Sequence, residues 1–441
     1  MHANEPAVES VQEPERALAL VVERTMELRD ALARAPAWER RFYELTMTEG
    51  AGELAQAITW YEELARESVH PEVDVRLAVL HAEAGRMAKV TDTLATWPAR
   101  GPPFDLYAAL IAAAYLDGPL PATGADLHAL AGIAPAGWFR TRLSERLAIR
   151  AGDDEWLKAV HASVSACMQQ LLGRVRVMTV MELALLVGGI VALVALLKHG
   201  AARAAVADAE IPPPWSLGAG LTVLIRGGAA GALVAIGLLY ASPWSVDSAV
   251  MEALAVPMMN LPIILLVRRH LTPPSASSLT LRLGLWPRPG GWRALVLTTA
   301  AVVAAGIVID LVVAVIGEWM ELGAHWTEWF DADMAWGPPA MVAAALASAV
   351  LFAPIFEEIV FRGLLFGTLR NAFGWPLAAA LSAAVFAVAH GYGSLGFASV
   401  FLSGVLWAYA YESTGSLLPG IIAHAVNNLV ASAGVLWLVR M

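Results

Sequence analysis

From about Val175 onward the chain is a series of long apolar runs separated by short polar segments, and this pattern allows few folds. The run from Pro339 to Phe356 contains 18 residues without a charge, which is long enough to cross most of the hydrocarbon core of a bilayer. Hydrophobic residues make up 58% of the 441-residue chain, a share expected of a protein that crosses the membrane many times. We therefore predict a multi-pass integral membrane protein of the all-α class, located in the plasma membrane.

The apolar runs predict a transmembrane helix bundle of about eight spans, preceded by a soluble helical domain. Residues 175–290 are expected to hold the first transmembrane helices and their connecting loops, and residues 291–441 the rest of the bundle. The expected spans are residues 178–197, 217–241, 248–267, 294–317, 339–357, 376–391, 395–411 and 417–439.

Residues 1–174 differ from the rest in being rich in charged residues, alanine and leucine. Their apolar residues recur at helical spacing, which predicts a soluble helical domain. Four glycines mark expected helix breaks 33 to 34 residues apart: Gly52, Gly85, Gly118 and Gly152. This spacing weakly resembles tetratricopeptide-type helical repeats, which would offer a docking surface to a protein partner. The alternative is a plain helical domain whose glycines have this spacing by chance.

Three ionisable residues, Glu357, Glu358 and Arg362, follow the uncharged run directly. A charged side chain near the centre of a span costs about 2.5–3.5 kcal/mol on insertion scales, so such residues need a reason to be there. On an α-helix Glu358 and Arg362 lie on one face and can pair, whereas Glu357 is turned away by about 100°. The alternative to a functional site is an ion-paired helix end at the membrane surface.

Further polar residues lie in the apolar runs that follow. His390 closes one run, and His424 and Asn428 lie four residues apart in another, so the latter two share one helix face. Polar groups at membrane depth face the interior of a helix bundle and are candidates for function. We therefore expect the two histidines and the asparagine to converge with Glu357 on a buried water molecule.

Taken together, these segments resemble a known family. The motifs Glu-Glu-x-x-x-Arg, Phe-x-x-x-His and His-x-x-x-Asn match residues 357–362, 386–390 and 424–428, in order and on apolar segments. They resemble those of the CPBP intramembrane proteases, the CAAX protease and bacteriocin-processing (Abi-type) family related to type II CAAX prenyl endopeptidases. The resemblance implies that residues 291–441 form a catalytic membrane core that hydrolyses peptide bonds.

The chemistry of such a site can be assigned from the residue types. Glu357 can take a proton from a water molecule that His390 also holds, and His424 and Asn428 can donate hydrogen bonds to the tetrahedral oxyanion. Glu358 with Arg362 would fix the helix that carries Glu357. No serine or cysteine stands at a matching position beside a histidine, so a covalent nucleophile is not expected. In the alternative mechanism, Glu357, His390 and His424 bind a zinc ion that activates the water.

The expected partners follow from these assignments. The resemblance implies a membrane-anchored substrate, either a prenylated CAAX-like protein or a peptide with a leader, and the lipid bilayer surrounds the protein. The net charge of −10 provides no basic surface for nucleic acid. Two other functions stay open: a non-catalytic membrane scaffold or bacteriocin-immunity-type protein, and a transporter. A transporter should show internal symmetry between the halves of its membrane region, which is not apparent in this sequence.

Overall fold

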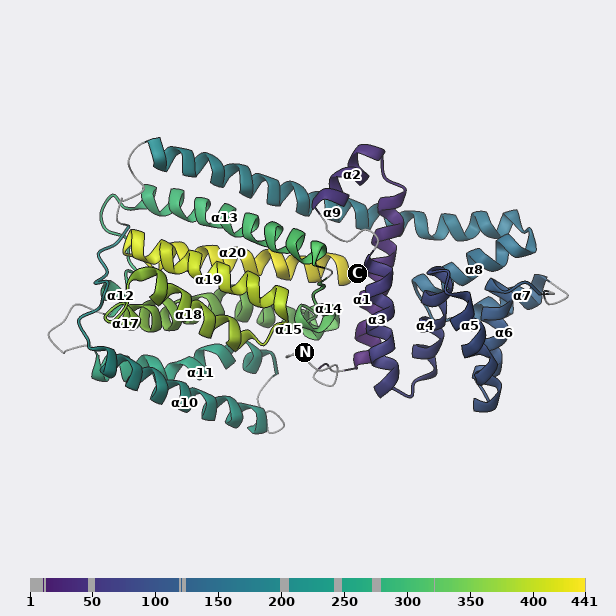
Figure 1. Cartoon of the computed structure of the whole chain (residues 1–441), viewed down its shortest axis with the longest axis horizontal. Coiled ribbons are helices and arrows are strands. Elements are labelled where there is room, and N and C mark those ends of the chain that lie inside the picture. The colour runs from purple at the N-terminus through teal and green to yellow at the C-terminus, as the bar shows by residue number, and fades with distance from the viewer. Residues whose placement is uncertain are drawn as a thin grey trace. The chain divides into compact units, whose positions relative to one another are not determined.

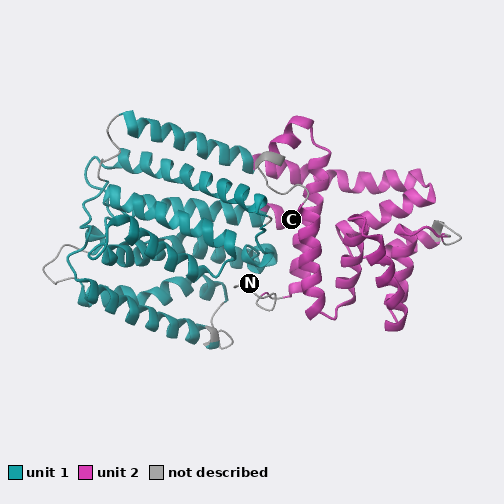
Figure 2. Cartoon of the chain, in the orientation of Figure 1, with its two compact units in different colours: residues 1–6, 178–436, 440 teal, residues 7–177, 437–439, 441 magenta. Residues whose placement is uncertain are grey.

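The computed structural model of the chain describes residues 11, 13–46, 52–118, 120, 124–198, 206–241, 248–271, 279–320 and 322–440. Within these ranges the secondary structure is helical, and no strand occurs among them. The chain divides into two compact units, which Figure 2 shows in different colours. One unit contains mainly residues 7–177 and the other mainly residues 178–436. The all-α class predicted from the sequence is thus confirmed.

The amino-terminal unit is built from amphipathic helices that enclose an apolar core. Leu18, Val21 and Val22, which recur at helical spacing, are almost fully buried on the first helix. Its elements are α1 (Pro14–Ala33), α2 (Ala37–Thr46), α3 (Gly52–Glu67), α4 (Pro71–Glu83), α5 (Met87–Thr96), η2 (Trp97–Arg100), α6 (Phe104–Tyr115), α7 (Gly124–Gly132), α8 (Trp138–Ala151) and the first part of α9 (Asp154–Lys198).

The glycines that were expected to break helices lie at helix boundaries. Gly52 begins α3, and Gly118 follows α6. Gly85, between α4 and α5, and Gly152, after α8, have positive φ angles of 71° and 66°, a conformation that glycine adopts without steric cost. Consecutive helices therefore turn back on one another here. The tetratricopeptide-type arrangement itself stays a prediction.

The membrane unit is a bundle of long apolar helices, most of which run along a common direction in Figure 1. After α9, its elements are α10 (Leu217–Ala241), α11 (Ser248–His270), α12 (Leu279–Arg282), α13 (Trp292–Trp319), η4 (Trp326–Glu328), α14 (Ala332–Trp336), α15 (Pro339–Leu346), η5 (Ala347–Phe352), α16 (Ala353–Glu357), η6 (Glu358–Phe366), α17 (Gly367–Leu369), α18 (Trp375–His390), α19 (Ser394–Thr414), α20 (Leu418–Gly434) and η7 (Val435–Val439).

Seven helices of the described residues are long and apolar enough to cross a membrane, whereas about eight spans were expected. The difference lies at residues 376–391. These residues form α18, which has only 16 residues, and a complete crossing needs about 20. The first span was also expected to begin at residue 178, but it is the end of the 45-residue helix α9, which begins at Asp154.

The expectation that a span ends at residue 357 is wrong. The helix continues from Pro339 to Leu369, so the two glutamates lie within it and not at its end. Two stretches of this helix, Ala347–Phe352 and Glu358–Phe366, have the wider π-helical turn. Such turns are rare and frequently occur at functional sites. The two glutamates therefore do not lie at a helix end.

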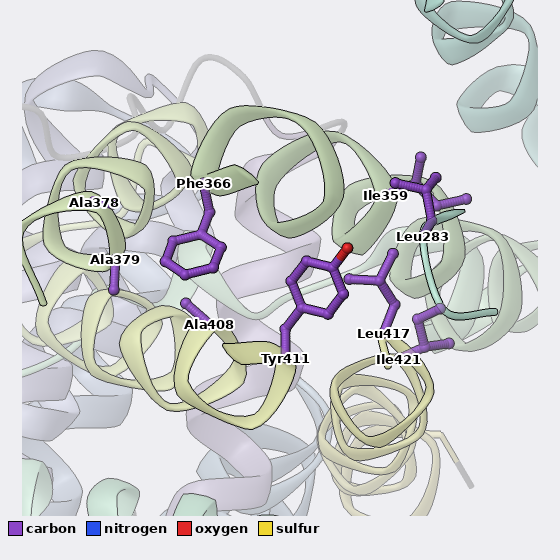
Figure 3. Close-up of a cluster of buried hydrophobic side chains, with 9 residues drawn as sticks. All are labelled: Leu283, Ile359, Phe366, Ala378, Ala379, Ala408, Tyr411, Leu417 and Ile421. Carbon is purple, nitrogen blue, oxygen red and sulfur yellow. The ribbon is translucent and has the colours of Figure 1, made fainter. Parts of the chain in front are cut away.

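An apolar cluster joins this helix to the rest of the bundle. Phe366 of η6 packs beside Ala378 and Ala379 of α18, and Tyr411 of α19 lies edge-on to Phe366 at 6.3 Å (Figure 3). Small alanines on α18 let the large aromatic ring approach closely. The other buried members of the cluster are Leu283, Ile359, Ala408, Leu417 and Ile421.

Candidate active site

The centre of the candidate site is a buried ion pair on one turn of η6. Arg362 Nη1 donates to Glu358 Oε1 at 2.8 Å, and both residues are 0% exposed. The sequence predicted this pairing from the four-residue spacing, and the pairing forms although the turn is π-helical and not α-helical. A buried charge is tolerated only when a partner compensates it. Each of these two charges can therefore be buried only because the other compensates it.

His424 of α20 lies between the two glutamates. Its Nδ1 is 3.3 Å from Glu358 Oε1, and its Nε2 is 3.8 Å from Glu357 Oε2. Pro419 lies in the first turn of α20. The backbone N–H that proline lacks would have no partner within the helix at this position, so the proline does not disturb the helix. The helix then brings His424, only 3% exposed, into contact with the carboxylates. The structure thus places Glu357, Glu358, Arg362 and His424 in one cluster.

His390 closes α18 at the same site. Its Nδ1 donates to the carbonyl of Phe386 at 2.8 Å, so a neutral His390 presents Nε2 as an acceptor. The ring also lies 4.5 Å from the Phe386 ring and interacts electrostatically with Glu357. Gly391, at a φ of 68°, ends the helix immediately after the histidine. Because α18 is short, its carboxyl-terminal residue lies at the site.

Asn428 lies one turn after His424 on α20, as expected, but its side chain already has a partner. Its Nδ2 donates to the carbonyl of Ala349 in η5 at 2.8 Å. In a π-helical stretch the hydrogen bonds of the backbone follow a different pattern from those of an α-helix. The amide of Asn428 therefore ties α20 to the irregular part of the fifth span. It keeps a second N–H group that this bond does not use.

An aromatic residue that the motifs did not include completes the site. Trp407 of α19 stacks on His424 with the ring centroids 4.3 Å apart and the planes inclined by 19°. Trp407 also contacts Arg362, whose guanidinium lies 5.0 Å from its ring and 4.1 Å from the ring of Phe386. Sequence reasoning missed Trp407 because an aromatic residue in an apolar span usually serves as core or as a lipid contact. Its position on a span between two motif helices was the only available signal.

Two glycines allow the helices to approach the charged residues closely. A Cβ atom on Gly404 would lie 2.8 Å from Arg362 Nη2 and 2.9 Å from the Cβ of Ala383, so no larger residue fits there. A Cβ on Gly420 would lie 3.0 Å from Glu358 Oε2. Close helix contact at small residues is a general feature of membrane bundles. Here the small residues leave room for buried charged side chains.

Glu357, His390 and His424 have some, but not all, of the features of a zinc site. Both histidines use Nδ1 to donate to another protein group, as zinc-bound histidines do. Glu357 Oε2 and His424 Nε2 face each other, but among the described residues no three His, Cys, Asp or Glu side chains form a group that could hold a metal ion. The set Glu357, His390 and His424 is thus incomplete as a zinc site, and no reaction step is derived through a metal.

Comparison with known proteins identifies the part of the chain that carries these residues. Residues 339–430 match the model of the family described as type II CAAX prenyl endopeptidase Rce1-like. The matched range begins with the fifth span and contains every candidate site residue. No curated protein matches the chain, and no solved structure matches it. The buried cluster therefore lies in the part of the chain, residues 339–430, that is similar to the type II CAAX prenyl endopeptidase Rce1-like family.

Proposed function

We propose that this domain is a glutamate-type intramembrane endopeptidase in which Glu357 activates a water molecule. One observation carries the proposal. Glu357 Oε2 is buried, has no hydrogen-bond partner among the described residues, and lies 3.8 Å from His424 Nε2. A separation of this size between two polar groups is suited to a shared water molecule. A carboxylate beside such a water can act as the general base of a hydrolysis.

In the proposed reaction, the water attacks the scissile carbonyl carbon while its proton moves to Glu357. The carbonyl π electrons move onto oxygen, and the proton on Glu357 is then delivered to the leaving amine nitrogen as the C–N bond breaks. His390 accepts a hydrogen bond from the attacking water through Nε2, because its Nδ1 proton is held by the Phe386 carbonyl. This arrangement orients the water without a covalent intermediate.

His424 is proposed to stabilise the oxyanion as an imidazolium. Its Nδ1–H donates to Glu358, and its Nε2–H points to the side of Glu357, where the substrate carbonyl would lie. The free N–H of Asn428 is the second proposed donor. Loss of one good oxyanion donor costs about 3–4 kcal/mol of transition-state stabilisation. Glu358 and Arg362 touch no substrate in this scheme and act as positioning residues.

The proposed substrate is a protein or peptide that is itself anchored in the bilayer. Glu357, Glu358, Arg362 and His424 lie on helices that are long and apolar enough to cross the membrane, so the scissile bond is proposed to reach the site from within the lipid layer or from its surface. A prenylated CAAX-like tail and a membrane-associated leader peptide both meet this requirement. The family match to a prenyl endopeptidase model supports the former.

The decisive experiment is cleavage of prenylated and membrane-anchored peptides by the purified full chain in nanodiscs. We expect Glu357→Gln and His390→Ala to lower the turnover number by at least about 100-fold each, as is typical of general acid–base residues. The matched control is Glu252→Gln, which removes a half-buried carboxylate of α11 away from the site. This control should cleave like the wild type.

The same assay separates the remaining alternatives. Activity that survives Glu357→Gln would overturn the assignment of the base. Activity that is lost with a chelator and restored by zinc would overturn the metal-free mechanism. Wild-type protein that binds an anchored peptide but does not cleave any member of the library, with the Glu357→Gln variant binding equally well, would favour the scaffold function.

A further inference from the structure

Helix α2 of the amino-terminal unit is fixed to the part of α9 that directly precedes the membrane span. Arg176 donates two hydrogen bonds to Glu39, from Nε to Oε1 at 2.6 Å and from Nη2 to Oε2 at 2.7 Å. Tyr43, one turn further along α2, belongs to a buried cluster with Leu171 and Val175 of α9. Two independent contacts therefore hold one face of α2 against α9.

The position of the bilayer on α9 follows from the sequence of that helix. Between Arg176 and Lys198 the only charged residue is Glu182, so residues 177–197 are the part that can lie in hydrocarbon. At 1.5 Å per residue this stretch is roughly 30 Å long, which equals the thickness of the hydrocarbon core. Arg176 thus lies at the boundary between hydrocarbon and headgroups. Glu39, which is bonded to it, lies at the same level.

The opposite face of α2 carries side chains suited to that level. Trp38 is 72% exposed, the most exposed tryptophan of this unit, and Arg40 and Arg41 beside it are exposed as well. An indole ring left in water loses the benefit of burial, whereas tryptophan is enriched at the headgroup level of membranes. Arginine next to the bilayer surface attracts anionic headgroups.

The charged side chains of α2 that the structure describes are one buried carboxylate and two exposed arginines. The one carboxylate of the helix's first turn, Glu39, is 3% exposed and is neutralised by Arg176. Arg40 Nη1 donates to the carbonyl of Ala33, at 3.3 Å. Among the described side chains, the exposed surface of α2 therefore carries an indole and two positive charges.

We propose that α2 is an interfacial anchor: Trp38 inserts at the headgroup level of the bilayer and Arg40 and Arg41 bind anionic phosphate headgroups. The anchor is independent of the proposed peptidase chemistry and concerns a different part of the chain. It would hold α2 at the membrane surface. The partner is the lipid itself, and a protein bound to this face is the competing outcome.

The test uses the full chain in nanodiscs with an environment-sensitive fluorophore at Ala37→Cys, a position on the exposed side of α2 that keeps Trp38 and both arginines. Cys167, the single cysteine of the chain, is first replaced by serine. Nanodiscs contain lipids with a nitroxide on the headgroup, with or without phosphatidylglycerol. The control probe is Val69→Cys, which is 90% exposed in the same unit.

We expect the probe at position 37 to be quenched at least twofold more than the probe at position 69, with stronger quenching when phosphatidylglycerol is present. Trp38→Ala should reduce the quenching, and the double change Arg40→Gln/Arg41→Gln should remove its dependence on anionic lipid. Equal, weak quenching at both positions would overturn the proposal and leave a protein partner as the explanation for Trp38. Quenching that is equal with and without phosphatidylglycerol would overturn the role of the arginines. Unchanged unfolding temperatures of the variants show that α2 is still folded.

Discussion

The two units of the chain use the same kind of ion pair in opposite surroundings. In the amino-terminal unit, Lys89 bonds Glu62 at 2.7 Å, with 57% and 32% of the two side chains exposed. In the membrane unit, Arg362 bonds Glu358 at 2.8 Å with almost no exposure of either side chain. The distances are nearly equal, so the geometry alone does not distinguish the pairs. The surroundings decide what each pair contributes.

Water explains the difference. At the surface of the soluble unit the two charges are hydrated whether or not they pair, and such pairs contribute about 0–1 kcal/mol. Inside the membrane unit each charge would be left without any solvent if its partner were removed. The soluble unit can therefore carry many charged residues of little individual importance. In the membrane unit Glu357, Glu358 and Arg362 lie together in the interior, where the loss of one charged partner is costly.

The largest expected effect comes from breaking the buried pair. Arg362→Met should lower the free energy of unfolding by about 3–5 kcal/mol, because Glu358 would remain as an uncompensated buried charge. Denaturant unfolding of the full chain in detergent micelles measures this. The matched surface change Lys89→Ala should cost less than about 1 kcal/mol.

A double change sharpens the same comparison. Glu358→Leu/Arg362→Met removes both charges and should recover most of the stability lost in Arg362→Met while leaving the protein inactive. If the double variant were as unstable as the single variant, the orphaned charge would not be the cause of the destabilisation.

One carboxyl group of the soluble unit, that of Glu23, is partly buried although most charged groups of this unit are hydrated. Burial raises the pKa of Glu23 in α1 from 4.5 to about 7, although Arg76 acts in the opposite direction. Below pH 4.5 the group is protonated in both the folded and the unfolded state. As the pH rises to about 7 the unfolded chain loses this proton first, so folding is weakened by about 3 kcal/mol.

Hydrogen exchange of the full chain measures this effect. Amides of α1, corrected for the intrinsic pH dependence of exchange, should be better protected at pH 5 than at pH 7.5. In Glu23→Gln the difference should be largely absent, because no proton is exchanged at that position. A difference of the same size in this variant would assign the pH dependence to another group.

The smallest expected effect concerns the aromatic ring in the site. Trp407→Leu removes the stacking on His424 and the face that contacts Arg362, contributions of about 0.5–2 kcal/mol each. We expect kcat/KM for an anchored peptide to fall about tenfold or more in Trp407→Leu. The variant Trp407→Phe should retain part of the wild-type kcat/KM. Equal activity of the leucine and phenylalanine variants would show that ring stacking is not what positions His424.

Much of this organisation could be predicted from the sequence because hydrocarbon penalises charge. Glu357, Glu358, Arg362, His390 and His424 stand out in apolar runs, and the structure brings them to one site. No such contrast exists in the soluble unit, where Glu23 looks like any other glutamate on a helix. Burial of that residue depends on which helices cover it, and spacing along one helix does not contain this information.

The sequence by itself determined that the chain is helical, that it crosses the membrane many times and that Glu358 pairs with Arg362, because these follow from apolar length and from spacing within one helix. Only the tertiary structure decided that the helix of the fifth span continues to Leu369, that α18 ends after 16 residues, and that Trp407 stacks on His424. These features depend on contacts between helices far apart in the chain. Such contacts are set by how closely small residues such as Gly404 let the helices approach.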